Sequence, residues 1–503
     1  MSDNGFSEPR RQELLGVIIL FGENLRRLFR LVAALLFASI YAKNLAISGT
    51  MIFSIGALLM AIYTVFQYLR FKFHIEGDEL IIQRGVLVRE RLTIPLERIQ
   101  TVNLSQNVIQ QLLKLTGVKI DTAGSGKEEL KISALKRTDA LELQSVLGRE
   151  IKQARAGEGE PSDSPEEFSS ERNVTLVSLN IPKLLLVGLT ENHIRSGLVA
   201  LGVVWGYFWQ FEDMIGDYVY SNMDIDPDQF DEAVSLTSFG LIAIIYILIV
   251  FLIASMLISM IRTVLRHFDL KAILGQRSLN VTSGLLKKNS YTIPLNKIQM
   301  VTWKGNFLRK IPGFESVLIR QSKSGNDERN LNVEIPACYK GQREQLEGVL
   351  FSHEMRGQAF TYSPHPFYRV YLTVIFSLIG LAFFGQAALL IKDMRVWFGL
   401  LIYLPVVILW VRKYTGTVTL TTNGDLIQFS KGWLFTSRRQ LKAYKIQSMK
   451  FRQSIFQKRR GTGHLKLFTA GGVLSMRFMP YPLVEELYNY LLYKVELSDK
   501  NWM

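Results

Sequence analysis

Long apolar stretches alternate along this chain with segments in which apolar and polar residues take turns. A helix needs about 20 apolar residues to cross the hydrocarbon core of a bilayer. Six stretches approach that length, and they fall into three pairs, at residues 28–47 and 51–69, 196–211 and 233–261, and 370–391 and 396–411. This pairing predicts three membrane hairpins, with a kink at Pro405 in the last span.

A shared pattern follows each predicted hairpin. It consists of a glycine and, nine residues later, a run of the type Ile-Pro-Leu-x-Arg/Lys-Ile-Gln. The copies are Gly85 with residues 94–100, Gly284 with 293–299 and, more diverged, Gly432 with 441–447. The chain is therefore predicted to be one structural unit used three times.

Alternating apolar and polar residues predict short strands around these runs. Residues 74–85 predict two strands joined by a turn at Gly77, because glycine takes the positive φ of tight turns without strain. Residues 107–117 predict a short helix that stops at Gly117, followed by a strand over 118–122. Amphipathic helices that end the three copies are predicted over 138–147, 339–353 and 482–495. Each copy is thus predicted to be a small sheet closed by a C-terminal helix.

A membrane hairpin, then this signature, then a terminal helix resembles the bacterial pleckstrin-homology-like, or membrane-flanked, domain family. Three copies with six spans resemble the larger members of that family. The resemblance implies a multi-pass membrane protein of the α+β class, with six transmembrane helices in three hairpins. Each hairpin would precede a small PH-like, bent and partly open β-barrel at the cytoplasmic leaflet, capped by a C-terminal helix. The third copy departs from the signature, with Lys442 and Ala443 in place of the Pro-Leu pair.

These features divide the chain into seven segments. They are an N-terminal helix and hairpin 1 (1–70), PH-like domain 1 (71–153), an acidic linker (154–173), an interfacial helix with hairpin 2 (174–262), PH-like domain 2 (263–356), hairpin 3 (357–413) and PH-like domain 3 (414–497). The linker is rich in small, acidic and proline residues. Such a composition cannot build a core, so the linker is predicted to be flexible.

The charge distribution predicts the orientation of the spans. Lys and Arg number 59 against 44 Asp and Glu, which gives a net charge of +15. Basic residues gather at the span ends that face the repeats, whereas the connector over 212–232 is acidic and holds no Lys or Arg. The positive-inside rule therefore predicts cytoplasmic termini and repeats in a bacterial plasma (inner) membrane. The same clustering argues against nucleic acid as the partner of these basic residues.

Most signature positions are interpreted as structural. The set comprises Gly85, Pro95, Arg98, Gln100, Gly284, Pro294, Lys297, Gln299, Gly432, Lys445 and Gln447. We expect the prolines to mark an edge or a strand start, since proline cannot donate to a ladder. We expect the glutamines to fix a bend. Arg98, Lys297 and Lys445 leave two interpretations open: a shared headgroup or partner contact, or a basic residue on the outward face of a strand.

The third copy carries the strongest basic cluster, interleaved with aromatic residues. Its members are Arg438, Arg439, Lys442, Lys445, Arg452, Phe456, Lys458, Arg459 and Arg460. Basic residues near an anionic leaflet each add about 1 kcal/mol of attraction, so the cluster is a candidate contact with membrane lipids. A solvated face is the alternative. Residues 74–83 hold no Lys or Arg, which disfavours specific inositol phosphate binding.

Catalytic and metal-binding constellations are missing from the sequence. The six histidines are scattered without HExxH spacing, and the single cysteine, Cys338, excludes a disulfide framework or a multi-cysteine metal site. We therefore predict no enzyme activity, no cofactor and no metal. The predicted function is a membrane scaffold or binding protein in cell-envelope maintenance, whose three tethered domains add up weak contacts. Anionic lipids are the predicted partners, and the family resemblance further implies a smaller one-domain relative or self-association. The alternative function is a component of a lipid or small-molecule transport system.

Overall fold

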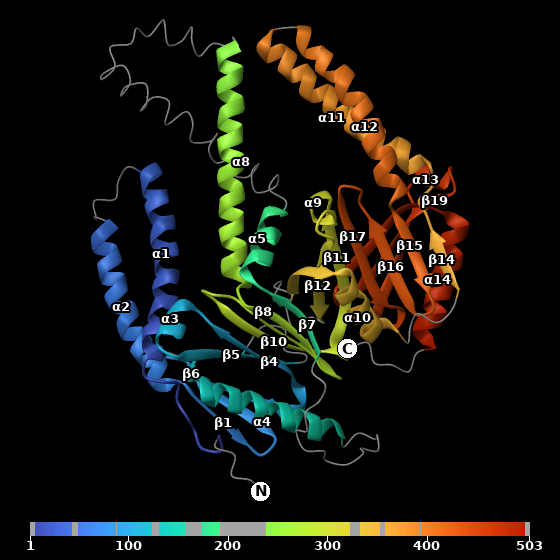
Figure 1. The fold of residues 1–503 in the computed structure, drawn as a ribbon. Helices are drawn as coiled ribbons and strands as arrows, with labels where there is room; N and C mark the ends of the chain where they lie inside the picture. Colours follow the sequence, from blue (N-terminus) through green and yellow to red (C-terminus); the bar gives the residue numbers. More distant parts are fainter. Residues whose placement is uncertain are drawn as a thin grey trace, which may run out of the picture.

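The computed structural model describes residues 6–42, 49–86, 88–122, 130–156, 174–191, 238–321, 332–352, 358–392 and 394–497. The sheets form a row that runs from the first repeat to the third (Figure 1). Three long helices, α8 (Ser238–His267), α11 (Phe367–Ile391) and α12 (Trp397–Gly416), rise from one side of this row. The helices α1 (Gly16–Ala42) and α2 (Gly49–Arg70) stand at the end formed by the first repeat.

The three repeats fold from equivalent elements. After α2, the first repeat contains β1 (Lys72–Glu76), β2 (Glu79–Arg84), β3 (Glu90–Pro95), η1 (Leu96–Arg98), β4 (Ile99–Gln106), α3 (Val108–Leu112), β5 (Leu115–Thr122), β6 (Leu130–Lys136) and α4 (Arg137–Ala156). The second contains β7 (Val174–Leu179), α5 (Ile181–Leu189), α8, β8 (Leu270–Leu274), β9 (Ser278–Ser283), β10 (Lys288–Pro294), η2 (Leu295–Lys297), β11 (Ile298–Asn306), α9 (Phe307–Lys310), β12 (Phe314–Gln321), β13 (Asn332–Tyr339) and α10 (Lys340–Phe351).

The third repeat contains β14 (Ala359–Tyr362), α11, η3 (Met394–Val396), α12, β15 (Thr419–Asn423), β16 (Leu426–Lys431), β17 (Phe435–Lys442), η4 (Ala443–Lys445), β18 (Ile446–Arg452), α13 (Ile455–Lys458), β19 (Thr462–Thr469), β20 (Gly472–Pro480) and α14 (Tyr481–Glu496). The helices predicted at the end of each copy are present as α4, α10 and α14. The turn predicted at Gly77 is also present, with a φ of 58°, and Gly424 repeats it with the same φ in the third repeat.

Each repeat has its own apolar core, to which both of its halves and its terminal helix contribute. In the first repeat Phe73 on β1, Val118 on β5 and Leu143 on α4 lie in one buried cluster. The second and third repeats have corresponding clusters. The cores also touch across the repeats, since Leu426 of the third repeat belongs to the second core and Met300 of the second repeat belongs to the third core.

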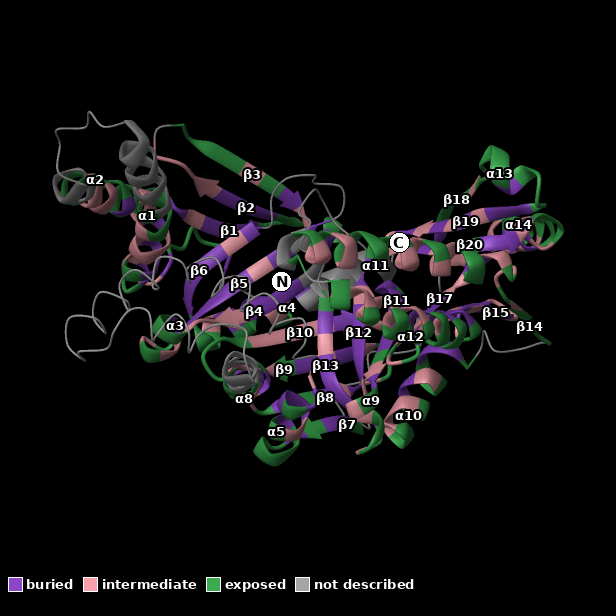
Figure 2. Ribbon diagram, turned by 90° about the horizontal axis from the view of Figure 1, so that it is seen from above, coloured by how far each residue is buried: buried purple, intermediate pink, exposed green. Residues whose placement is uncertain are grey.

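Hydrogen bonding between strands follows a different division from the cores. Strands β1 to β3 form a sheet of their own, but β4 to β6 join the next repeat in a seven-stranded sheet with the order β6-β5-β4-β10-β9-β8-β7. A second seven-stranded sheet has the order β13-β12-β11-β17-β16-β15-β14, and β18 to β20 form the last sheet (Figure 2). Neighbouring repeats therefore share sheets: after each short 3-10 turn, the chain leaves one sheet and enters another. The bent, partly open barrel expected in each repeat stays a prediction.

Two local predictions need correction. The short helix of the first repeat ends at Leu112, because Lys114 adopts a left-handed φ of 54°, and Gly117 lies inside β5 instead of stopping the helix. The segment predicted as an interfacial helix over 174–190 is a strand, β7, followed by the short helix α5. Strand β7 pairs with β8 and so gives the second repeat its outer edge.

Three helices in the described part of the chain are long and apolar enough to cross a membrane. They are Ile249–His267 within α8, Phe367–Leu389 within α11 and Met394–Gly416, which includes α12 with Pro405 inside it. The apolar stretch Ser54–Arg70 of α2 is shorter. Helices α11 and α12 pack together, with Tyr403 Oη donating to the carbonyl of Phe376 at 3.0 Å. The predicted span over 196–211 and the acidic connector after it lie outside the described residues.

Candidate lipid-binding site

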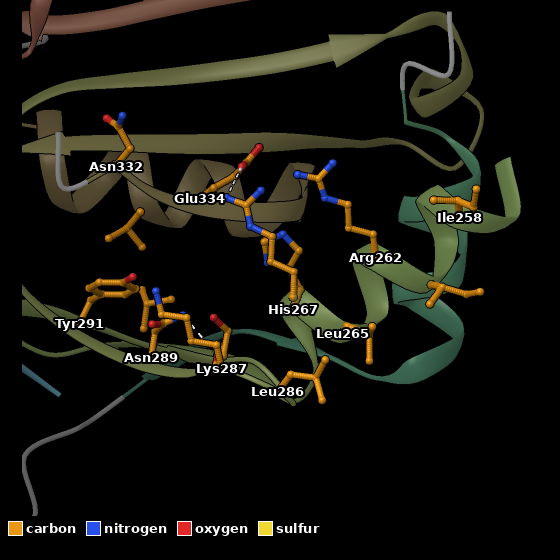
Figure 3. A pocket seen from close by; sticks show the side chains of 15 residues that line it. Ile258, Arg262, Leu265, His267, Leu286, Lys287, Asn289, Tyr291, Asn332 and Glu334 are labelled. Atoms are coloured by element: carbon orange, nitrogen blue, oxygen red, sulfur yellow. Dashed lines mark hydrogen bonds and ion pairs between the residues drawn. The ribbon is translucent and has the colours of Figure 1, made fainter. Parts of the chain in front are cut away.

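A cavity of about 580 Å³ opens at the foot of α8, between the two sheets to which the second repeat contributes (Figure 3). The C-terminal turns of α8 form one wall. The end of β9 and the start of β10 form the second wall, and the first residues of β13 form the third. The cavity therefore lies at the C-terminal end of a helix that is long and apolar enough to cross a membrane.

The lining changes from apolar to polar along the cavity. Ile258, Ile261 and Leu286 are exposed apolar side chains near the span. The opposite end carries the amides of Asn289 and Asn332, and in Figure 3 these lie far from Ile258. Such a gradient matches a molecule with an apolar and a polar part.

Positive charge dominates the polar part of the cavity. Arg262, Arg266 and Lys287 line it together with one carboxylate, Glu334. Arg266 Nη2 lies 3.7 Å from Glu334 Oε2, and the arginine side chain is 60% exposed, so water screens this pair. Guanidinium groups bind phosphate oxygens in a planar, bidentate geometry. The polar part of the cavity thus carries three cationic side chains and one carboxylate, a set that favours an anion.

Tyr291 supplies a neutral hydrogen-bonding group at the inner end. Burial raises the pKa of its phenol above the ordinary value, although the charges of Lys119 and Arg266 partly oppose the shift. The hydroxyl therefore stays protonated at neutral pH and can donate to an oxygen. Among the described residues, no group of three or more His, Cys, Asp or Glu side chains is arranged to hold a metal ion.

Comparison with known proteins agrees with this architecture. A family model for the bacterial PH domain matches the chain three times, over residues 24–151, 232–352 and 374–495. The chain belongs to this family. Each match begins within or just before a hydrophobic helix and ends in or next to the terminal helix of a repeat, so the structural unit of the family includes membrane helix and sheet together.

A relative with the same overall length supports the three-repeat form. The UPF0699 transmembrane protein YdbT of Bacillus subtilis (strain 168) is 25% identical over 472 residues, which cover 90% of this chain and 91% of the relative. The alignment therefore covers most of the chain, in which the three bacterial PH domain matches lie one after another. The predicted resemblance to three-repeat, membrane-anchored members of the family is confirmed.

The signature glycines have the same conformation in all three bacterial PH domains. Gly85, Gly284 and Gly432 have φ values of 106°, 110° and 101° in the turns that precede β3, β10 and β17. A Cβ at these positions would lie 1.9, 2.0 and 1.8 Å from a backbone carbonyl oxygen three residues ahead. Only glycine fits this turn without rearrangement. Pro95 and Pro294 are the last residues of β3 and β10 and lead into the 3-10 turn, so they mark a strand end instead of a strand start.

The signature glutamines occupy β-bulges. The register shifts between Ile99 and Thr101, between Ile298 and Met300, and between Ile446 and Ser448, so Gln100, Gln299 and Gln447 are the extra residues. A bulge bends its strand, and this is where each chain turns from one sheet into the next. Gln299 is buried and Gln447 is exposed, while the side chain of Gln100 lies outside the described residues.

The signature cations differ in their surroundings. Lys297 is 8% exposed and Lys445 only 1%, whereas Arg98 is exposed. The Nζ of Lys445 donates to the carbonyl of Asn296 in the second repeat at 2.9 Å. Desolvation lowers the pKa of Lys445 from 10.5 to about 8, and the nearby charge of Lys442 adds to the shift. Lys445 thus lies at the junction between the second and third repeats, and both lysines are too buried to contact a bilayer.

The predicted basic cluster of the third repeat is divided between two places. Arg438 reaches into the second repeat, 3.2 Å from Glu347 and 3.6 Å from Glu315, and lies over the ring of Trp303. Arg439 donates to the carbonyl of Val473 within its own repeat. These two arginines stabilise the packing of the sheets. Arg438, Arg439 and Lys445 therefore do not belong to the exposed basic cluster.

The remaining cluster surrounds α13. Ile455 and Phe456 are 77% and 78% exposed, and Lys458, Arg459 and Arg460 are exposed beside them. The guanidinium of Arg460 lies 3.5 Å from the ring centre of Phe367, the first residue of α11, so α13 lies at the foot of a span. The equivalent helices α3 and α9 also expose apolar residues, Val108 and Phe307. Contact of this cluster with lipid stays a prediction.

No motif in the sequence predicts the cavity, although the sequence contains a signal for it. When the repeats are aligned on their glycines, Arg262, Arg266 and Lys287 correspond to Tyr63, Gln67 and Val88 in the first copy and to Trp410, Tyr414 and Phe435 in the third. In the third copy Trp410 and Tyr414 stack on each other at 5.3 Å. Only the second copy therefore has this basic set.

Proposed function

We propose that this protein holds three bacterial PH domains at one leaflet of a membrane and binds the headgroup of an anionic phospholipid at the foot of α8. The observation that carries the proposal is the cavity itself, in which exposed apolar residues of the span continue into a wall with three cationic side chains. A phosphate would contact Arg262, Arg266 and Lys287, while acyl chains would lie along Ile258 and Ile261.

The position of the cavity favours a lipid over a soluble anion. A soluble phosphate would gain nothing from the apolar end, whereas a lipid buries acyl chain there and keeps its headgroup beside the guanidinium groups. The exposed apolar residues of α13, with adjacent Lys458 and Arg459, would add interfacial contact at the neighbouring repeat. Several weak contacts of this kind on one anchored chain add up by avidity.

The proposal includes a topology. Six spans in three hairpins would place the repeats and both termini in the cytoplasm of a bacterium, with the spans in the plasma membrane. Basic residues at the feet of the described spans, Arg262, Arg266, Arg369 and Arg412, support this orientation through the positive-inside rule. The physiological role we propose is scaffolding in cell-envelope maintenance, in which bound lipid would help to hold the repeats at the membrane surface.

A lipid-binding measurement tests the proposal. Full-length protein in nanodiscs of phosphatidylcholine is titrated with fluorescent phosphatidylglycerol, and compared with the variant Arg262→Gln/Arg266→Gln/Lys287→Gln. We expect the affinity to fall about tenfold or more, because each cation near a lipid phosphate contributes about 1 kcal/mol. Arg277→Gln is the matched control, since Arg277 is exposed in the turn between β8 and β9, away from the cavity. Equal affinities of the triple variant and the control would contradict the proposal.

A further inference from the structure

The two internal junctions between repeats use the same strand pairing. At the first junction β4 pairs antiparallel with β10, and Leu104 lies opposite Ser290. At the second, β11 pairs antiparallel with β17, and Trp303 lies opposite Arg438. Leu104 and Trp303 both stand five residues after the signature isoleucine that opens their strand, and Ser290 and Arg438 both stand three residues before the apolar residue that opens the signature run. The register is therefore identical.

This pairing leaves one strand at each end of the row without a junction. Strand β3, the equivalent of β10 and β17, pairs only with β2 among the described strands, and β18, the equivalent of β4 and β11, pairs only with β19. Figure 2 shows β3 and β18 at opposite ends of the molecule. The chain therefore presents both halves of its own junction, but too far apart to meet within one molecule.

Burial at the signature positions shows what these open edges lack. The basic residues that end η2 and η4, Lys297 and Lys445, are buried, and Lys445 donates to the second repeat, while Gln299 on β11 is 1% exposed and lies against Gly471 of the third repeat. Arg98 in the first repeat and Gln447 in the third are exposed, and no neighbouring repeat among the described residues covers them. The same residues are thus covered where a neighbouring repeat is present and exposed where it is absent.

We propose that β18 of one molecule pairs with β3 of a second copy of this chain, in the register of the internal junctions, so that the row of sheets continues from copy to copy. The same register places Phe451 opposite Arg91, Arg452 opposite Glu90 and Lys450 opposite Leu92.

The chemistry of the two edges fits this pairing. Strand β18 carries Lys450 and Arg452 and no acidic residue, and its Arg452 meets Glu90. Glu90 already pairs with Arg84 at 2.9 Å and keeps 58% of its side chain exposed, which leaves it open to a second cation. The pair Phe451 and Arg91 repeats the aromatic and arginine pair of Trp303 and Arg438 at the second junction. Charges on edge strands commonly protect against association, but here opposite charges meet at the predicted register.

The membrane helices allow this contact between neighbours. Since the long helices α8, α11 and α12 rise from one side of the row, two copies in one membrane stand the same way up, so an edge of one copy can face the complementary edge of the next. The contact is heterologous, because the two surfaces differ, and it leads to a ring if the rotation closes or to an open row if it does not.

Cysteine cross-linking in membranes tests the proposal. Two differently tagged full-length chains, both with Cys338→Ser, are co-expressed, one with Lys450→Cys and the other with Leu92→Cys. We expect an oxidant to link the two tags. Arg277→Cys replaces Leu92→Cys as the control, because Arg277 is more exposed than the half-buried Leu92 but lies away from the edge, so exposure alone would favour the control. Cross-linking no greater than with the control would overturn the proposal.

A charge exchange separates pairing from misfolding. Arg452→Glu in one chain should lower the cross-linking yield about threefold to fivefold, and adding Glu90→Arg in the other chain should restore it, as expected for facing charges on paired strands. Failure of the exchange to restore the yield would contradict the register. The purified chain is also cross-linked alone in nanodiscs. Loss of the product there would assign the edge to a different protein, such as a one-repeat relative, and would overturn the proposal.

Discussion

The inner junctions and the outer edges of this molecule contain the same residues in different surroundings. Lys445 is buried against the second repeat and Arg98, its equivalent, is exposed; Gln299 is buried and Gln447 is exposed. The signature is therefore not a fixed binding motif. In a repeat protein, the role of a position depends on whether a neighbouring repeat covers it.

The largest test of this contrast compares Trp303 with Phe451, its equivalent on the outer edge. Trp303 is 1% exposed and its Nε1 donates to Gln440 Oε1 at 2.7 Å, so Trp303→Ala should cost about 3–5 kcal/mol of unfolding free energy. Phe451 is half-buried against Tyr481, and Phe451→Ala should cost about 1–2 kcal/mol. Denaturant unfolding in detergent, followed by circular dichroism, measures both. Equal losses would mean that the junction adds nothing.

Substitutions of the signature glycines should lower stability whether or not a neighbouring repeat covers the position. Gly85→Ala and Gly432→Ala place a Cβ against a carbonyl oxygen at 1.9 and 1.8 Å, with positive φ, so each should lose about 1–3 kcal/mol or more. Gly348→Ala is the control, because it lies in α10 with open space around its Cβ position and should be neutral or slightly stabilising. Thermal unfolding of the three variants reports the difference, and a neutral Gly432→Ala would refute the strained turn.

Lys445 should give the stability a pH dependence that Arg98 does not. Its pKa is lowered from 10.5 to about 8 in the folded protein, so the unfolded chain binds more protons between these values. The cost of burying the charged Lys445 amine is absent above pH 10.5, grows as the pH falls, and is fully present below pH 8. Lys445→Met should remove this rise, measured as the unfolding midpoint from pH 7 to 10.5. Arg98→Met, at the exposed equivalent, should leave the rise unchanged.

The smallest expected effect is a difference in how fast a cysteine at each glutamine position reacts with a reagent in solution. In a Cys338→Ser background, Gln447→Cys should react rapidly with a maleimide in dilute detergent solution, whereas Gln299→Cys should react only after unfolding. The native Cys338 should be inert in the folded protein, since burial raises its pKa to about 12 and suppresses the reactive thiolate. Mass spectrometry of the labelled protein gives the rates. Fast labelling at position 299 would show that the second junction opens.

The local fold could be predicted from the sequence, because its signals are local. The turn at Gly77 needs positive φ, and the terminal helices carry an apolar stripe that the sequence displays directly. The helix at Asn107 was predicted to extend too far, since its end depends on the backbone of Lys114 and not on Gly117.

The sharing of sheets could not be predicted, because it depends on contacts between residues far apart in the chain. The pairing of β4 with β10 joins residues more than 180 positions apart, and the pattern of apolar residues in a strand does not identify the strand it pairs with. The predicted cluster illustrates the consequence. Arg438 and Lys445 look like surface cations in sequence, yet acidic and carbonyl groups of another repeat surround them. The cavity was missed for the same reason, since α8, β9, β10 and β13 contribute to it jointly.

The continuous hydrogen bonding from one repeat to the next also has a mechanical meaning. Because β4 pairs with β10 and β11 pairs with β17, one backbone ladder ties the first repeat to the second, and another ties the second to the third. Pulling two neighbouring repeats apart therefore requires a row of interstrand hydrogen bonds to break together, while the two seven-stranded sheets meet through η2 and the core of the second repeat. The protein is thus built as a strap of stiff links, along which the apolar helices are attached.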